Sequence, residues 1–578
     1  MDDAHRRRME PTHHALKVPA GLALAPALTL AAFLLPVVAG VAGTLLPAFG
    51  WLPALGGHTL GLEPWLELRS APGFATAWWT SVATGWTATL LSVVLAVAVV
   101  ASVHHRPWAV RLGEWMAPLL AMPHAALAIG FAFLVLPSGW LARLVSPGLS
   151  GWALPPDVST VGHASGWPLV AALLLKEVPY LVLMILGALG QVPARAQVLQ
   201  ARSMGYGAAQ AWLAVVLPQV LAQIRLPVLA VLAFSLSVVD VALVLGPAHP
   251  PTLAVQSVRW FSDPDTRWVF PASAAAALLL ATVAASAVGW MAIERALHAG
   301  VRRWARRGAR RAWVSKVAGV IAVIATVLAA LALLAIASLA LWSIATQWRW
   351  PDAWPVGWTL AHWQRQATQL AGPALATLVI GAASTLIALA LVLACLEHEA
   401  QRGRSMGSRA LWLLYVPLLV PQVAFLFGLQ VLLVRLGADG RWPAVVWAHL
   451  VFVLPYLFVS LADPWRAFDA RYARAALSLG ASRWRVFWRV KLPILLRPVL
   501  LAAAVAFAVS VGLYVPTLFA GAGRVATLTT EAVTLSAGAD RRVIGVWAFV
   551  QAVMPLLVYA LAAGVPRWLH HGRRGWAT

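Results

Sequence analysis

The 578 residues are 61% hydrophobic and only 11% charged. Soluble globular chains carry about a quarter charged residues, so this balance excludes them and predicts an all-α polytopic membrane protein. The net charge of +23 would also suit nucleic-acid binding. The sequence has no aromatic base-stacking platform or base-reading motif, however, so we expect no nucleic-acid partner. Cys395 is the single cysteine, and no Cys/His cluster suggests a metal site.

Apolar runs long enough to cross a bilayer recur along the whole chain. A membrane helix needs about 20 such residues, and about twelve runs meet this length. The first run is too long for a signal-peptide core and lacks a convincing cleavage site, so we expect an uncleaved first span. The expected spans are 20–46, 78–103, 115–136, 168–190, 226–247 and 269–293, then 316–342, 374–396, 410–434, 444–462, 498–520 and 544–564.

The second series of spans repeats short motifs of the first in the same order, which predicts two homologous six-helix halves. We expect a first half at 20–293, a basic linker at 294–315, a second half at 316–565, and tails at 1–19 and 566–578. The motif pairs are Thr80-Ser81 with Ala376-Thr377, Met122-Pro123 with Val420-Pro421, Gly130 with Gly428, Pro179-Tyr180 with Pro455-Tyr456, and Thr252-Leu253 with Thr527-Leu528.

Most of the lysines and arginines lie in alternate loops, on the side that also holds both termini and the linker. Cytoplasmic loops of membrane proteins are enriched in these residues, so we expect both termini in the cytoplasm. The arginine pairs of the linker, from Arg302 to Arg311, are expected to be solvated and to touch anionic lipid headgroups.

Two loops on this cationic side share one spacing. The segments 201–218 and 473–493 each contain a glycine, Gly205 or Gly480, followed at the same distance by Leu-Pro. In the second segment, apolar residues from Tyr472 to Leu479 recur at helical spacing, and arginines cover the following stretch. We therefore expect a short surface helix, a break at Gly480, and a second helix that stops at Pro493. Two unrelated interfacial amphipathic helices are the structural alternative.

This spacing resembles the cytoplasmic EAA loop of ABC-importer permeases, whose pattern is Glu-Ala-Ala, three residues, Gly, nine residues and Ile-x-Leu-Pro. The resemblance extends from about residue 75 to about 565. The family glutamate is replaced by Leu199 in the first copy and Arg474 in the second, and the isoleucine by Val215 and Val490. A fixed salt bridge through that glutamate is therefore not expected here.

The resemblance implies a fused, double-length permease of the bacterial inner membrane, similar to the iron(III) and thiamine types. It implies two separate ABC ATPase subunits docked on the loops, a periplasmic substrate-binding protein, and ATP bound by the partner rather than by a cofactor site in this chain. The coupling residues implied are Ala201, Gly205, Leu217, Pro218, Ala475, Ala476, Gly480, Leu492 and Pro493.

Three charged residues lie well inside expected spans. Lys176 and Glu177 lie mid-span, where an unpaired charge costs on the order of 2.5–3.5 kcal/mol, so they face the bundle interior or water. They either line a translocation path or form ion pairs that fix the packing. Asp240 either lines the path or sits at the membrane interface. The matching positions of the second half hold Phe452, Val453 and a residue near Leu513, so a path here would be asymmetric.

Two functions other than an importer permease remain as alternatives for this sequence. The sequence contains no P-loop, catalytic triad or metal-hydrolase motif, so we expect no enzyme activity in the chain itself. An ion-driven secondary transporter could also have six plus six helices, but it would carry acidic residues in several spans and would not explain the paired loops. A membrane-embedded enzyme or an assembly scaffold would be expected to show a polar cluster inside the membrane, and none is apparent in the sequence.

Overall fold

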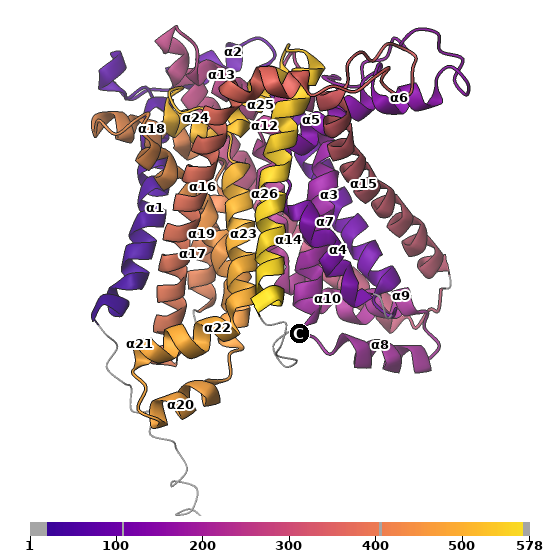
Figure 1. The fold of residues 1–578 in the computed structure, drawn as a ribbon, viewed down its shortest axis with the longest axis vertical. Helices are drawn as coiled ribbons and strands as arrows, with labels where there is room; N and C mark the ends of the chain where they lie inside the picture. Colours follow the sequence, from indigo (N-terminus) through magenta and orange to yellow (C-terminus); the bar gives the residue numbers. More distant parts are fainter. Residues whose placement is uncertain (1–19, 107–108, 312, 404–406, 570–578) are drawn as a thin grey trace, which may run out of the picture.

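The computed structural model describes residues 20–106, 109–311, 313–403 and 407–569, and the regular structure within these ranges is helical. The expected tail 1–19 and most of the tail 566–578 lie outside the described residues. The helices stand side by side in one bundle (Figure 1). Among the described residues, nine helices are long and apolar enough to cross a membrane. The number rises to twelve if each of three bent helix pairs counts as one span.

Each expected span corresponds to one helix or to one pair of helices. The first part of the chain forms α1 Ala20–Ala48, α2 Glu63–Ser70, α3 Phe74–Val103, α4 Ala109–Ala121, α5 His124–Val135, α6 Trp140–Val145, α7 Trp167–Leu189, α8 Ala194–Ser203, α9 Ala208–Ala211, α10 Leu217–Gln223, α11 Arg225–Ser237, α12 Asp240–Leu245, α13 Leu253–Phe261 and α14 Val269–Arg306.

The remaining helices complete the bundle. They are α15 Trp313–Ile344, α16 Ala361–Arg402, α17 Ser408–Leu419, α18 Val423–Arg435, α19 Trp442–Arg466, α20 Ala470–Ser478, α21 Arg483–Val486, α22 Leu492–Ile494, α23 Leu496–Val511, α24 Val515–Gly521, α25 Leu528–Ser536 and α26 Arg541–Leu569.

Four of the expected spans are broken rather than continuous. The run 115–136 divides into α4 and α5 just before Pro123, and 410–434 divides into α17 and α18 at Val420-Pro421, with a bend of 90°. Proline lacks an N–H group and restricts the residue before it, so a helix readily ends at such a position. The runs 226–247 and 498–520 divide into α11 with α12 and α23 with α24.

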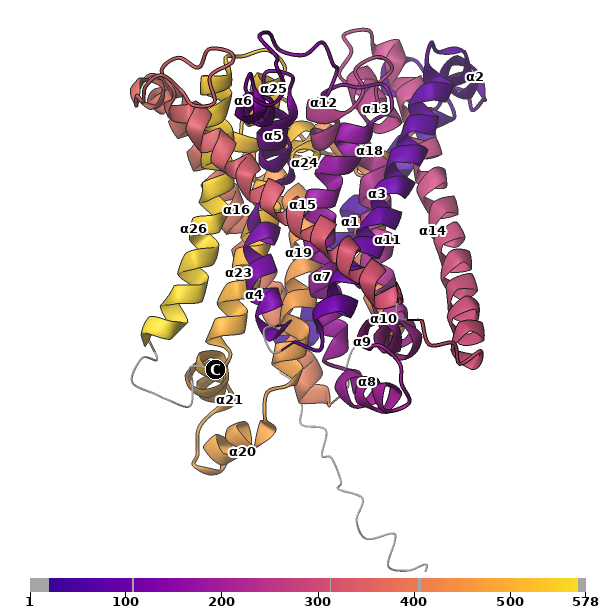
Figure 2. The same cartoon turned by 90° about the vertical axis from the view of Figure 1, so that its right-hand side faces the viewer.

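The first helix of each half packs against the other half. Helix α1 lies along α18, and α15 crosses α5, α3 and α7 diagonally (Figure 2). Small residues allow these contacts: a β-carbon at Gly428 would collide with the Gly40 carbonyl, and one at Gly130 with the Ala335 carbonyl. Gly428 also donates its N–H to the Thr44 hydroxyl at 3.1 Å, and the Ser338 hydroxyl donates to the Gly130 carbonyl at 3.0 Å. Each half therefore packs its first helix, α1 or α15, against the other half.

The two halves also repeat a side-chain cap at the start of matching helices. The Ser81 hydroxyl of α3 accepts the Leu253 N–H, and the Thr377 hydroxyl of α16 accepts the Leu528 N–H, both at 2.8 Å. Each bond satisfies a backbone donor that the first turn of α13 or α25 leaves unpaired. The residues paired in the sequence repeat thus occupy equivalent places in the fold.

The bundle has two distinct ends. Helices α8 and α9 and helices α20 and α21 lie at one end, here called the loop end, while α2, α6, α13 and α25 lie at the opposite end (Figure 1).

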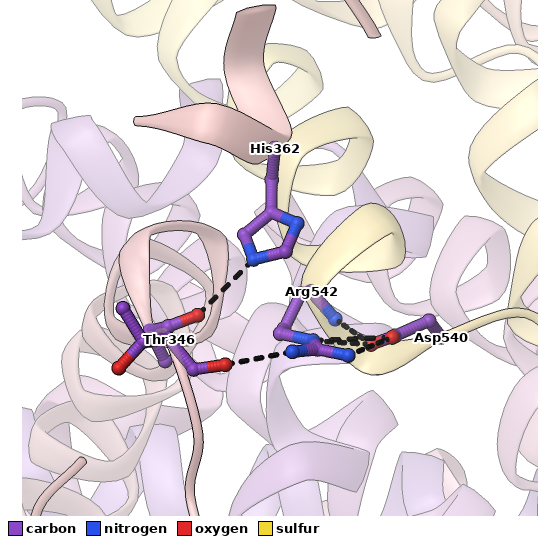
Figure 3. Close-up of polar contacts among 5 residues, drawn as sticks. Thr346, His362, Asp540 and Arg542 are labelled. Carbon is purple, nitrogen blue, oxygen red and sulfur yellow. Dashed lines mark hydrogen bonds and ion pairs between the residues drawn. The ribbon is translucent and has the colours of Figure 1, made fainter. Parts of the chain in front are cut away.

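At the end opposite the loop end, the Arg542 guanidinium joins the Asp540 carboxylate to the Thr346 carbonyl, at 3.0 and 2.7 Å. His362 contacts the Ala345 carbonyl at 3.2 Å (Figure 3). These bonds tie together the ends of α15, α16 and α26, and Arg542 holds the pKa of the Asp540 carboxyl below its usual value.

Candidate functional site

A cavity of about 230 Å³ lies between the two halves. The first half contributes residues from the α4–α5 break, α7, α11 and the start of α12. The second half contributes residues from the α17–α18 break, α19, α23 and the start of α24. The helix breaks thus help to form the walls of the cavity, where their backbone groups can be satisfied by protein or water. All three ionisable residues singled out in the sequence, Lys176, Glu177 and Asp240, line it.

Lys176, on α7, caps the end of α4. Its ammonium group donates to the carbonyl oxygens of Leu119 at 3.2 Å, of Leu120 at 2.6 Å and of Met122. These carbonyls lack helical partners because α4 stops before Pro123, and a cation is favoured at a helix C-terminus. Within the described residues no ion pair joins Lys176 to its neighbour Glu177, so of the ion pairs considered as the alternative to path lining, the mutual pair does not form.

Glu177 faces His124, which no sequence pattern indicated. The Glu177 carboxylate lies 3.5 Å from His124 Nε2, and the His124 ring packs on Phe234 with 4.6 Å between the ring centres. Asp240 is the first residue of α12 and is buried in the same wall. His124, Lys176, Glu177 and Asp240 therefore form a polar cluster inside the bundle, which contradicts the expectation that no such cluster exists.

The opposite wall is apolar and aromatic. Phe452 and Leu513, the repeat counterparts of Lys176 and Asp240, also line the cavity. The first half thus contributes charged residues where the second half contributes apolar ones, which is the asymmetry expected from the sequence. Four of the seven tyrosines in the chain converge here from both halves. They are Tyr180 on α7, Tyr415 on α17, Tyr456 on α19 and Tyr514 beside α24. The Pro-Tyr repeat pair could have indicated Tyr180 and Tyr456, but no sequence pattern indicated the other two.

We expect Lys176→Met to destabilise the chain by about 2 kcal/mol, since it leaves three buried carbonyls without their charged donor. Thermal unfolding of the purified chain in detergent would measure the loss. Lys316→Met is the matched control, because Lys316 is exposed near the start of α15. Equal unfolding temperatures for the two variants would contradict the capping role.

The two EAA-like loops have the same construction at the loop end. In each, a short helix (α8 or α20) ends just before a glycine with positive φ, +89° at Gly205 and +83° at Gly480. That backbone conformation strains other residues, which explains the glycine at both positions. A second short helix then passes into a π-helical turn, Trp212–Val216 or Phe487–Lys491, at matching positions in the two loops.

The helix does not stop at Pro493 as expected from the sequence. It continues through Pro493 to Ile494, as the first loop continues through Pro218 to Gln223. Proline has no N–H to donate and crowds the preceding turn, and the wider π-helical turn directly before Leu-Pro accommodates it. Leu217, Pro218, Leu492 and Pro493 therefore lie at the start of helices that lead, after bends of 68° and 77°, into α11 and α23.

The loops differ in exposure. In the first, Ala201 is buried and the Gln210 side chain binds the linker backbone, donating to the Ala309 carbonyl at 2.6 Å and accepting from the Arg311 N–H at 2.9 Å. The Arg310 side chain also lies beside Gly205. In the second, no residue of α20, which includes Ala475 and Ala476, is buried, and Gly480 faces open space. Part of the basic linker thus packs on the first loop rather than standing free.

Comparison with known proteins identifies the family. Residues 387–571 match the family described as the binding-protein-dependent transport system inner membrane component. Over 516 residues, 89% of this chain and 93% of the relative, the chain is 32% identical to the inner membrane ABC transporter permease protein YnjC of Escherichia coli K12.

Shorter matches agree with this assignment. The molybdenum transport system permease protein ModB of Mycobacterium bovis is 37% identical over 30% of this chain and 70% of its own length. The putrescine transport system permease protein PotI of Escherichia coli K12 is 30% identical over 19% of this chain and 41% of its own length. The chain therefore belongs to the binding-protein-dependent inner-membrane permeases of ABC transporters, and it is a multi-pass membrane protein.

Proposed function

We propose that this chain supplies both halves of the permease of an ABC importer, with the translocation path between these halves and one ATPase docking loop in each half. The observation that carries the proposal is the paired construction of the loops. Both have a positive-φ glycine, a π-helical turn and a Leu-Pro helix start, and both lie at the same end of the bundle. Two ATPase subunits, which would bind ATP, would each engage one loop.

The fold offers a direct mechanical connection from loop to cavity. The first loop leads through α10 into α11, which supplies Ala230 and Phe234 to the cavity wall. The second leads through α22 into α23, which supplies Val505 and Ala508. Closure of the ATPase pair would draw the loops together, and the two bent helices would transmit that motion to the chamber. Such bistable rigid-body motion is a recurrent basis of conformational switching.

The distribution of Lys and Arg supports a cytoplasmic loop end with both termini on the same side. In this orientation the end that carries α13 and α25 faces a periplasmic binding protein, the delivery partner that the family name implies. Because the linker covers part of the first loop, we propose that the two loops dock their ATPases unequally. Two of the reported relatives are named for molybdenum and for putrescine, so relatedness alone assigns no substrate.

Vesicle transport distinguishes this proposal from an ion-driven transporter. Membrane vesicles with and without the chain would be loaded with ATP. They would then be given an extract that contains binding proteins, together with a mixture of small molecules, and their contents would be compared by mass spectrometry. We expect chain-dependent accumulation that persists after the proton and sodium gradients are collapsed and stops when ATP is removed. Accumulation that disappears with the gradients, and is indifferent to ATP, would favour the secondary transporter.

A further inference from the structure

We infer that the cavity between the halves is a binding site for a small organic cation, an amine or quaternary ammonium compound. The inference rests on the proposed function, since it identifies the chamber as part of the translocation path. Its basis is the chemistry of the walls, which combine two buried carboxylates with an aromatic surface. A volume of about 230 Å³ is smaller than the roughly 300–1,000 Å³ of pockets that hold drug-sized ligands.

The charges in the wall favour a cation over an anion. An ammonium group has three N–H donors, and those of Lys176 are directed at three backbone carbonyls of the α4 end. Among the described residues that line the wall, Lys176 is the one Lys or Arg, and it therefore has no donor left for an anion. Glu177 and Asp240 supply two carboxylates at the same chamber, and the Glu177 carboxylate lies 3.5 Å from His124 Nε2. This local acidic balance stands out in a chain whose net charge is +23.

The aromatic groups favour an organic rather than a metal cation. Tyr180, Tyr415, Tyr456 and Tyr514 surround the chamber together with Phe234 and Phe452. A cation over an aromatic face gains about 0.5–2 kcal/mol, most where water is excluded. In the part of the chain that the structure describes, the four phenol hydroxyls have no hydrogen-bond partner, so they are available to ligand N–H groups or water.

The same side chains do not suit a bare metal ion. Among the described residues, no group of three or more His, Cys, Asp or Glu side chains is close enough to hold one. Hard cations require several oxygen ligands in a single shell, and softer ones require clustered nitrogen or sulfur. The chamber instead offers separated carboxylates and ring faces, an arrangement that fits a cation with an apolar body.

Binding to the purified full-length chain in lipid nanodiscs tests the inference. The probes are choline, its neutral isostere 3,3-dimethyl-1-butanol, and molybdate, each titrated to about 10 mM so that millimolar affinity is detected. We expect saturable choline binding, at least about tenfold weaker binding of the neutral isostere, and no binding of molybdate at the same site. Saturable molybdate binding that displaces choline, or no choline binding at all, would overturn the assignment.

Variants locate the binding and separate it from folding. Asp240→Asn and Tyr456→Leu should each weaken choline binding about tenfold, while Tyr456→Phe should retain most of it because the ring face remains. The controls are Asp463→Asn, an exposed carboxylate on α19, and Tyr559→Leu on α26, neither of which lines the cavity. Equal loss in variants and controls would place the binding elsewhere and overturn the inference. ATPase co-purification, measured on the same preparation, reports on the importer proposal separately.

Discussion

Replacing Gly428 with leucine should prevent stable assembly of the two halves, with a loss of more than about 3 kcal/mol in unfolding free energy. The added side chain would meet the backbone of α1 at Gly40 and Gly43, and backbone cannot rotate away as a flexible side chain can. It would also disturb the bond from the Gly428 N–H to Thr44. Size-exclusion profile and thermal unfolding of the purified chain would measure the effect.

The matched control is Gly319→Leu. Gly319 also lies within a long apolar helix, α15, but its added side chain meets open space. This variant should remain monodisperse with an unfolding temperature close to that of the unmodified chain. If Gly428→Leu behaved like Gly319→Leu, the close crossing of α1 and α18 would not be what holds the halves together.

Leu479→Glu should weaken ATPase binding at the second loop at least tenfold while leaving the permease folded. Leu479 follows α20 directly, precedes Gly480 and is 87% exposed, so its apolar side chain covers nothing within the chain. An exposed apolar side chain at a docking loop is suited to a partner pocket, where a charge would be left buried and unpaired. Retention of ATPase on the tagged, purified chain would be quantified against the unmodified protein.

Leu149→Glu makes the same change at the opposite end of the bundle. Leu149 is equally exposed, at 87%, and lies in the loop after α6. It should leave ATPase retention unchanged. Comparable retention in both variants would show that the apolar surface of the second loop does not contribute to docking. A folded Leu479→Glu chain that retains clearly less ATPase than the unmodified chain is the result that our proposal requires.

Much of the fold follows from hydropathy and repeats. A bilayer-length apolar run must form a helix to satisfy its backbone, which is why each expected span corresponds to a helix or helix pair. The breaks at Pro123 and Pro421 have a local cause in the sequence. The break between Ser237 and Asp240 does not, since the intervening Val238 and Val239 carry no turn signal. Tertiary packing determines that break.

Other features depend on contacts between distant segments. Sequence repeats align Gly130 with Gly428, but only the fold places each of them against the first helix of the other half. The polar cluster was underestimated for the same reason, because His124 and Glu177 belong to different spans. Similarly, charge alone indicated a solvated linker, whereas hydrogen bonds from the Gln210 side chain hold part of that linker on the first loop.

Co-purification tests the central claim most directly. The unmodified chain would be extracted from its native host in mild detergent, and its partners would be identified and counted by mass spectrometry and native mass measurement. The proposal expects an ABC ATPase at two copies per chain, lost or reduced when both Gly205 and Gly480 are replaced by valine, which positive φ disfavours. A stable chain that purifies without any ATPase, and whose partners are unchanged by those substitutions, would contradict it.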